Sequence, residues 1–210
     1  GTSAAPSRLI HGGLKYLETG ELRLVAESTY ERNLLLRNAA HLVKPLPTMI
    51  PIYSWTKGVG AAIRALLGSP TAPRSRGALL VKIGLRLYDF YGARARVLPR
   101  HRMVGRARAI AEVPALTPQI VAVGTYHDAV VTAPERLVLE LVQDGLRAMP
   151  GSAAMNWTRI SGRAGGTIEI TGPEEAVTRV SPRLVVNAAG PWIDDVNRHL
   201  GLGTELIGGT

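Results

Sequence analysis

A histidine, a lysine and a tyrosine lie close together in residues 7–18, which read SRLIHGGLKYLE. The apolar spacing predicts a helix interrupted by the glycine pair 12–13, because each glycine costs about 1 kcal/mol inside a helix. Helical geometry would place His11 and Lys15 on one face, with Tyr16 beside Lys15. A proton acceptor, a cation and a phenol next to two glycines would suit the oxidation of an anionic substrate against a flat cofactor. The alternative is a surface helix with an ordinary histidine and a solvated lysine.

A second segment, residues 184–192 (LVVNAAGPW), runs from an apolar strand through small residues into the start of a helix. Backbone N–H groups at such a turn can bind the phosphates or the adenine of a dinucleotide. The same order of strand, glycine and helix is common in α/β proteins, and core packing alone would explain Trp192. This segment is therefore weak evidence by itself.

The first candidate site is followed by an amphipathic pattern that predicts a helix over residues 21–41, with Arg23 and Glu27 spaced as an i,i+4 pair. The face expected to be buried consists of Leu22, Val25, Ala26, Thr29, Asn33 and Leu36. Three prolines should end the helix and bracket a short extended segment at 49–53: Pro45, Pro47 and Pro51.

Residues 78–91 read as a strongly apolar helix with one narrow polar stripe formed by Lys82, Arg86 and Asp89. The pattern fits either a mostly buried helix or a helix lying on a bilayer surface. This helix belongs to the basic segment 57–108, which holds twelve Lys or Arg and one acid in a chain of net charge +9. Such a segment could meet nucleic acid, anionic lipid or a phosphorylated substrate, or it could be only a solvated surface. Because no interleaved aromatic residues and no nucleic-acid-binding motif accompany it, no nucleic-acid partner is expected.

Further along the chain we expect a strand at 119–131, and Thr132 and Glu135 have the spacing of a capping box with Pro134 in the first helical turn. The helix that follows should bury Leu137, Val138, Leu141, Val142 and Leu146. Short strands are expected at about 154–161, 166–171, 176–180 and 183–188, and a helix should begin at Pro191. The fold class is therefore α/β or α+β.

The composition restricts the chemistry. The chain contains no cysteine and its five histidines are scattered, so neither a metal site nor a thiol nucleophile is expected. No stretch approaches the roughly 18 consecutive apolar residues of a spanning helix, and the first residues lack the features of a signal peptide. We expect a cytoplasmic protein, with any membrane contact peripheral and on the inner face.

Taken together and in this order, several segments resemble the FAD-dependent glycerol-3-phosphate dehydrogenase family of the D-amino-acid-oxidase-like flavoproteins. The most specific is the twelve-residue segment 7–18. The others are residues 2–3, 23–25, 85–89 (LRLYD), 126–128 (YHD), 135–139 (ERLVL) and 185–192. The resemblance implies a partial FAD-binding Rossmann-like domain with a β-meander, interleaved with part of a substrate-binding domain. The implied division places residues 1–44 and 132–193 in the FAD-binding domain, 45–131 in the substrate domain, and 194–210 at the return to it.

The resemblance also implies roles for individual residues. Lys15 and Tyr16 would face the substrate, and His11 and Tyr16 would stand near the hydroxyl proton that a base removes. Residues 2–13 would wrap the flavin and its diphosphate, a strand near 158–160 would lie beside the adenine, and the turn at 188–190 would contact FAD through its backbone. The implied cofactor-binding residues are Thr2, Ser3, Ser7, Arg8, Leu9, Ile10, His11, Gly12, Gly13, Ile160, Ala188, Ala189 and Gly190.

The implied reaction is the oxidation of sn-glycerol 3-phosphate to dihydroxyacetone phosphate, as a step of glycerol metabolism, with hydride transfer to flavin N5 and electrons passed to a membrane quinone. One alternative is an oxidase that uses oxygen, and another is a related flavoprotein that oxidises a different hydroxy acid or an amine. An anionic membrane surface would be a further partner, and a homodimer is compatible with the resemblance.

Two departures from the family pattern matter. The family usually has arginine at Lys15, and a lysine supplies the charge but not a bidentate fork, which keeps a different substrate open. No G-x-G-x-x-G motif precedes the matching segments, and the family continues into further active-site residues after the last residue of this chain. We therefore expect an internal piece of a longer enzyme, inactive by itself.

Overall fold

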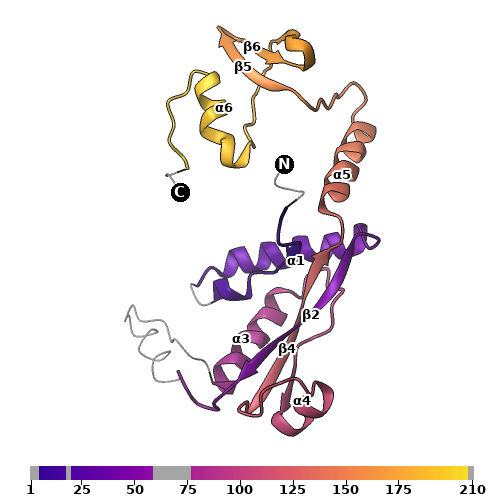
Figure 1. Ribbon diagram of the computed structural model, residues 1–210, viewed down its shortest axis with the longest axis vertical. Helices are drawn as coiled ribbons and strands as arrows, with labels where there is room; N and C mark the ends of the chain where they lie inside the picture. The colour runs from indigo at the N-terminus through magenta and orange to yellow at the C-terminus, as the bar shows by residue number, and fades with distance from the viewer. Residues whose placement is uncertain (1–4, 18–19, 59–76, 208–210) are drawn as a thin grey trace. The chain divides into compact units, whose positions relative to one another are not determined.

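A computed structural model describes residues 5–17, 20–58 and 77–207, and its contacts divide the chain into two compact units, Gly1–Gln143 and Asp144–Thr210 (Figure 1). Each unit has its own antiparallel sheet. The mixture of helices and sheets agrees with the expected fold class. None of the helices within these ranges is long and apolar enough to cross a membrane.

The sheet of the first unit is built around strand β4 (Ala122–Val131), the strand expected at 119–131. Strand β2 (Val43–Ile52) pairs with one edge of β4 along the whole length of β4. At the other edge of β4, β1 (Leu9–Ile10) pairs with its C-terminal end and β3 (Arg102–Gly105) with its N-terminal end. The expectation that prolines bracket a short extended segment at 49–53 is wrong, because they lie inside the ten-residue strand β2. They are two and four residues apart, so all three nitrogens point to one side of the strand. Since proline has no N–H, this side is the open edge of the strand.

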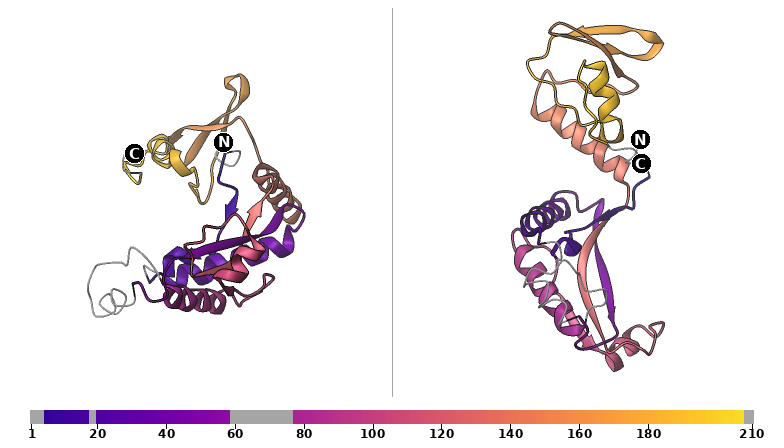
Figure 2. Two further views of the ribbon diagram at one scale, coloured as in Figure 1. Left: turned by 60° about the horizontal axis from the view of Figure 1, so that its bottom comes forward. Right: turned by 90° about the vertical axis from the view of Figure 1, so that its left-hand side faces the viewer.

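Helices α1 (Leu22–Asn38) and α3 (Ala78–Tyr91) cover one face of the β2–β4 pair (Figure 2). Both helices were expected, and the predicted Arg23–Glu27 pair forms at 2.7 Å. Leu22, expected on the buried face of α1, is exposed at the first position of the helix. The core between helices and sheet includes Leu36, Val43, Ala129, Val131, Ile52, Val81, Leu85 and Ala122.

Helix α5 (Pro134–Ala148) begins with proline as expected, but the predicted capping box is absent. The Thr132 hydroxyl donates to the Leu42 carbonyl at 3.1 Å, so it does not cap the helix. The expected buried face is also wrong in part: Val138, Leu141 and Val142 are exposed, because no element of the described chain covers them. The short helix α4 (Arg106–Glu112) and strand β3 were not predicted.

The second unit contains a three-stranded meander of β5 (Arg159–Ala164), β6 (Thr167–Thr171) and β7 (Val177–Val180), as expected. The short helices are η3 (Pro173–Glu175), η4 (Gly190–Trp192) and α6 (Ile193–His199). The strand expected at 183–188 is wrong, because that segment pairs with no other strand of the described ranges and Leu184 and Val186 are each 79% exposed.

Candidate active site

The first candidate segment is not the continuous helix that its apolar spacing predicted. Strand β1 occupies Leu9–Ile10, and the 3-10 helix η2 (Leu14–Leu17) begins after the glycines. Gly13 has a φ of +73°, a left-handed backbone conformation that ends any helical continuity and that glycine adopts without steric cost. His11 and Lys15 therefore do not share a helical face. Thr2 and Ser3 lie outside the described residues.

Gly12 is required by packing inside the protein. A Cβ atom at this position would lie 2.3 Å from Tyr88 Oη and 2.4 Å from Thr29 Cγ2, so no side chain fits between the segment and helices α1 and α3. This packing explains the glycine without any cofactor. A contact between Gly12 and the flavin remains a prediction.

The His11 and Tyr16 side chains remain near each other. The His11 and Tyr16 rings are 6.2 Å apart between centroids, and the intervening Lys15 is exposed, with no ion pair to any residue in the described ranges. His11 Nδ1 accepts the Gly13 N–H at 3.2 Å, so the neutral ring carries its proton on Nε2. The segment thus carries an ammonium group, a phenol and an imidazole N–H.

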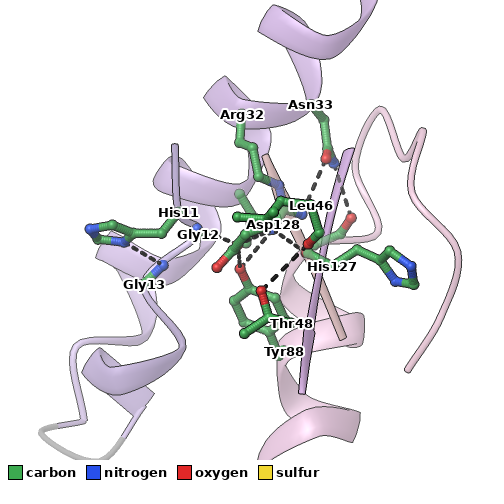
Figure 3. A network of polar contacts seen from close by, with 12 residues as sticks. His11, Gly12, Gly13, Arg32, Asn33, Leu46, Thr48, Tyr88, His127 and Asp128 are labelled. Atoms are coloured by element: carbon green, nitrogen blue, oxygen red, sulfur yellow. Dashed lines mark hydrogen bonds and ion pairs between the residues drawn. The ribbon is translucent and has the colours of Figure 1, made fainter. Parts of the chain in front are cut away.

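A buried polar network holds the backbone at Gly12 from inside the protein (Figure 3). Asp128 Oδ1 accepts three hydrogen bonds: from the Gly12 N–H at 3.0 Å, from Arg32 Nη1 at 2.9 Å and from Tyr88 Oη at 2.6 Å. Arg32 also donates to Tyr88 Oη at 2.6 Å and to the His127 carbonyl at 3.1 Å. The Arg32 and Asp128 side chains are only 4% and 3% exposed. The network therefore joins α1, α3 and β4 to the backbone next to His11.

The electrostatics of the network depend on this burial. Burial raises the pKa of Tyr88 far above its usual range, with a further contribution from Asp128 that opposes the lowering effect of Arg32. The Tyr88 hydroxyl consequently keeps its proton and donates a hydrogen bond to the Asp128 carboxylate. Removing one member of a buried ion pair typically costs about 3–5 kcal/mol, because the remaining charge is left without a partner.

The sequence contained a signal for this network that was not used. Arg32 lies seven residues after the buried Val25, which places it on the buried face of α1. A charged side chain on a buried face requires a partner. Tyr88 and Asp128 contributed to the family resemblance, but their side chains were assigned no role.

The second candidate segment forms a turn held by amide side chains. Asn187 Nδ2 donates to the Ile193 carbonyl at 2.9 Å and to Asn197 Oδ1 at 2.7 Å, and Asn187 Oδ1 accepts the Ala189 N–H at 3.1 Å. Gly190 adopts a φ of +57°. The N–H groups of Ala188 and Gly190 form no hydrogen bond with a described residue. Two of the three N–H groups expected to meet FAD are thus open to a ligand.

The remaining residues of this region lie near the surface. Trp192 is 57% exposed, so core packing does not explain it within the described residues. Ile160 is half-buried on β5, paired with Ile170.

The predicted cofactor contacts are divided between the two units. Ser7, Arg8, Leu9, Ile10, His11, Gly12 and Gly13 belong to the first, and Ile160, Ala188, Ala189 and Gly190 to the second. In the first unit, the exposed Arg8 side chain supplies a cation. In the second, the turn supplies the two open N–H groups. Each of these groups, taken within its own unit, can bind phosphate oxygens.

Residues 1–207 match the DAO family of FAD-dependent oxidoreductases, so the chain belongs to this family of flavoprotein oxidoreductases. FAD is the cofactor of this family, as expected from the resemblance. Among similar proteins, a glycerol-3-phosphate dehydrogenase of Synechocystis sp. is 32% identical, over 93% of this chain and 34% of the relative. A D-erythritol 1-phosphate dehydrogenase of Brucella abortus is 31% identical, over 98% of this chain and 37% of the relative.

A crystal structure of glycerol-3-phosphate dehydrogenase from Bacillus halodurans, complexed with FAD, resembles the chain with a TM-score of 0.56. The match covers 95% of this chain and 29% of that structure at 18% identity, and it supports the fold. The chain spans about a third of the length of the curated relatives it matches.

Proposed function

We propose that the whole protein oxidises sn-glycerol 3-phosphate to dihydroxyacetone phosphate with FAD. The observation that carries the proposal is the exposed Lys15 beside Tyr16 and His11, on a segment whose backbone is anchored by Asp128. The similarity to proteins named glycerol-3-phosphate dehydrogenase supports the same substrate. FAD, when bound, supplies the acceptor for the hydride that leaves the substrate carbon.

Each residue has a proposed role. The Lys15 ammonium binds the phosphate, and Tyr16 orients the polyol beside it. His11 takes up the hydroxyl proton at Nδ1, for which the hydrogen bond from the Gly13 N–H must open, and the Tyr16 hydroxyl stands near that proton as a hydrogen-bonding partner. Arg8, in the first unit, contacts the diphosphate of FAD, and the turn at 188–190, in the second unit, contacts FAD through its backbone.

The role of Lys15 can be tested in the whole protein. Lys15→Ala should raise KM for glycerol 3-phosphate roughly 10- to 150-fold, the equivalent of about 1.5–3 kcal/mol for a charge-assisted hydrogen bond, without lowering the FAD content. Lys15→Arg should preserve or improve KM, and Lys44→Ala, which removes an exposed lysine elsewhere, is the matched control. An unchanged KM for Lys15→Ala would show that Lys15 does not bind the phosphate.

A second candidate substrate is a longer phosphorylated polyol. The similarity to a protein named D-erythritol 1-phosphate dehydrogenase and the lysine at position 15 both support it. Because a phosphate on a polyol would use Lys15 in either case, the ratio of kcat/KM for the two substrates separates the candidates. We expect the ratio to favour glycerol 3-phosphate.

We also propose that the electrons pass to a quinone at an anionic membrane surface. The periodicity of residues 78–91 left open whether the helix is mostly buried or lies on a bilayer surface, and the exposed side of the helix supports the second interpretation. Helix α3 buries one side against the sheet, while the opposite side exposes an apolar row that reaches 72% exposure at Phe90. That row consists of Leu79, Ile83, Leu87 and Phe90. Lys82 and Arg86 lie beside it, and each basic group near an anionic bilayer contributes about 1 kcal/mol.

Vesicle co-sedimentation of the whole protein tests the membrane proposal. We expect binding to anionic but not neutral vesicles, lost at high salt, and weakened by Leu87→Ser with Phe90→Ser. Equal indifference to both lipid types would overturn it. Leu139→Ser, which changes an exposed leucine of α5, is the control.

Finally, we infer that the 210-residue chain alone is inactive. It spans only about a third of the length of its relatives, and the predicted cofactor contacts are divided between two separate units. The isolated chain should therefore purify without flavin absorbance. Near-equimolar FAD in the isolated chain would contradict this inference.

A further inference from the structure

The glycine pair points its two N–H groups at different partners. The Gly12 N–H donates to Asp128 Oδ1 at 3.0 Å, in a buried contact, and the Gly13 N–H donates to His11 Nδ1 at 3.2 Å, in a half-buried contact. The two N–H groups belong to consecutive peptides that share the Gly12 Cα. The direction in which the second N–H points, and with it the hydrogen bond that orients the His11 ring, therefore depends on how the buried carboxylate holds the first (Figure 3).

Tyr88 supports the same point from another side. Its Oη donates to Asp128 at 2.6 Å. The same atom would lie only 2.3 Å from a Cβ atom on residue 12. Its ring is fixed by an edge-on contact with Tyr126, with centroids 5.6 Å apart, and by the Arg32 guanidinium 5.4 Å above it. The Tyr88 hydroxyl is thus both a hydrogen-bond donor to the carboxylate and the surface on which Gly12 rests.

A buried ion pair is weak evidence for a stabilising role, because a hydrophobic replacement of similar volume is often equally stable. Because Asp128 accepts a hydrogen bond from the backbone of the candidate site at Gly12, the pair can instead hold that backbone in place. Held rigidly, a catalytic segment loses less to misalignment, and a displacement of about 1 Å can cost about 100-fold in rate.

We propose that Asp128, Arg32 and Tyr88 are positioning residues that act through the Gly12 N–H to set the orientation of His11. None of the three contacts the substrate. The consequence for catalysis rests on the proposed function, whereas the consequence for the backbone does not.

The first test uses Tyr88→Phe in the whole protein, because this change removes one hydroxyl and keeps the ring. We expect kcat with glycerol 3-phosphate to fall between about 10- and 100-fold. KM should stay within about threefold, since the flexible Lys15 still reaches the phosphate, and FAD content should not change. Tyr126→Phe, the same change at a neighbouring half-buried ring that does not bond to Asp128, should leave kcat within about twofold.

Amide hydrogen exchange provides a readout that needs no substrate. In Tyr88→Phe the Gly12 and Gly13 amides should exchange at least about 10-fold faster than in the parent, while α6 in the second unit stays unchanged. Asp128→Asn should have a larger effect at the same amides. If the loss of the charge opposite Arg32 prevents that variant from folding, Tyr88→Phe alone decides the outcome.

A double-mutant cycle with His11→Ala tests whether the network acts through the histidine. If it does, Tyr88→Phe should lower kcat much less in the His11→Ala background than in the parent. Fully multiplicative effects, or unchanged exchange at Gly12 and Gly13 in Tyr88→Phe, would overturn the positioning role. Absence of any activity with glycerol 3-phosphate in the parent would instead refute the proposed function and leave the exchange test valid.

Discussion

The two units hold their candidate ligand-facing turns in different ways. In the first unit, the Gly12 backbone is fixed by a buried carboxylate that is itself paired with Arg32. In the second, the turn at 188–190 is fixed by the neutral amides of Asn187, which is half-buried, and Asn197, which is buried. The proposed substrate-facing segment thus depends on buried charges, and the proposed cofactor-facing turn depends on hydrogen bonds between neutral groups.

The cores of the two units differ in the same direction. The first unit buries many apolar side chains between α1, α3 and the sheet. In the described part of the second unit, the buried apolar side chains are Ile168 and Leu200. This unit also leaves Trp157 84% exposed. Since burial of apolar area is the main stabilising contribution to folding, we expect the first unit to be the more stable.

The largest difference should follow from removing the centre of each network. Asp128→Ala leaves the Arg32 charge buried without its partner and should cost about 3–5 kcal/mol of unfolding free energy. Asn197→Ala removes neutral hydrogen bonds to Asn187 and Thr204 and should cost about 1–3 kcal/mol. The urea dependence of amide exchange in β4 and in α6 measures both. Equal costs would break the comparison between a charged and a neutral support.

A smaller difference is expected between two glycines. Gly12→Ala creates an overlap with Tyr88 and Thr29 and should cost roughly 1–3 kcal/mol, since the packed helices must shift. Gly190→Ala meets no atom within 4 Å and should cost only about 1 kcal/mol through its positive φ. Thermal unfolding of the two variants provides the measurement. A larger cost at Gly190 would show that the turn of the second unit is the more rigid one.

The smallest effect concerns pH in the first unit. Burial, assisted by Arg32, lowers the pKa of His127, and its Nδ1 is buried with no partner in the described ranges. In the unfolded chain the His127 imidazole has a pKa of about 6.5. It therefore binds a proton more readily there than in the folded protein. The stability that His127 contributes is complete above about pH 6.5 and is lost as the pH falls through that value toward the lower folded pKa.

His127→Gln should flatten this part of the stability profile, as measured by urea unfolding at a series of pH values. The same substitution at the exposed His199 is the control. A profile unchanged by His127→Gln would mean that the imidazole is not desolvated.

Elements with strong local periodicity were predicted well from the sequence, and elements fixed by long-range contacts were not. Helices α1 and α3 follow directly from apolar spacing. Residues 9–10 became a strand because they pair with residues 129–130 of β4, a contact that no local pattern specifies. The prolines of β2 are likewise compatible with a strand only because it lies at a sheet edge.

The same limit applies to the candidate site. His11, Lys15 and Tyr16 were recognisable from a short motif, but the support beneath them comes from Arg32 and Asp128, whose side chains meet across 96 positions of sequence. The charge on the buried face of α1 indicated that a partner exists. Only the fold identifies which residue it is.

Anaerobic reduction of the flavin in the purified whole protein tests the central claim most directly. sn-Glycerol 3-phosphate should bleach the visible flavin absorbance of the parent, more slowly in Tyr88→Phe and only at higher substrate concentration in Lys15→Ala. This pattern would assign binding to Lys15 and alignment to the Asp128 network. A flavin that glycerol 3-phosphate does not bleach, but that another phosphorylated polyol, a hydroxy acid or an amine does, would contradict the proposed substrate.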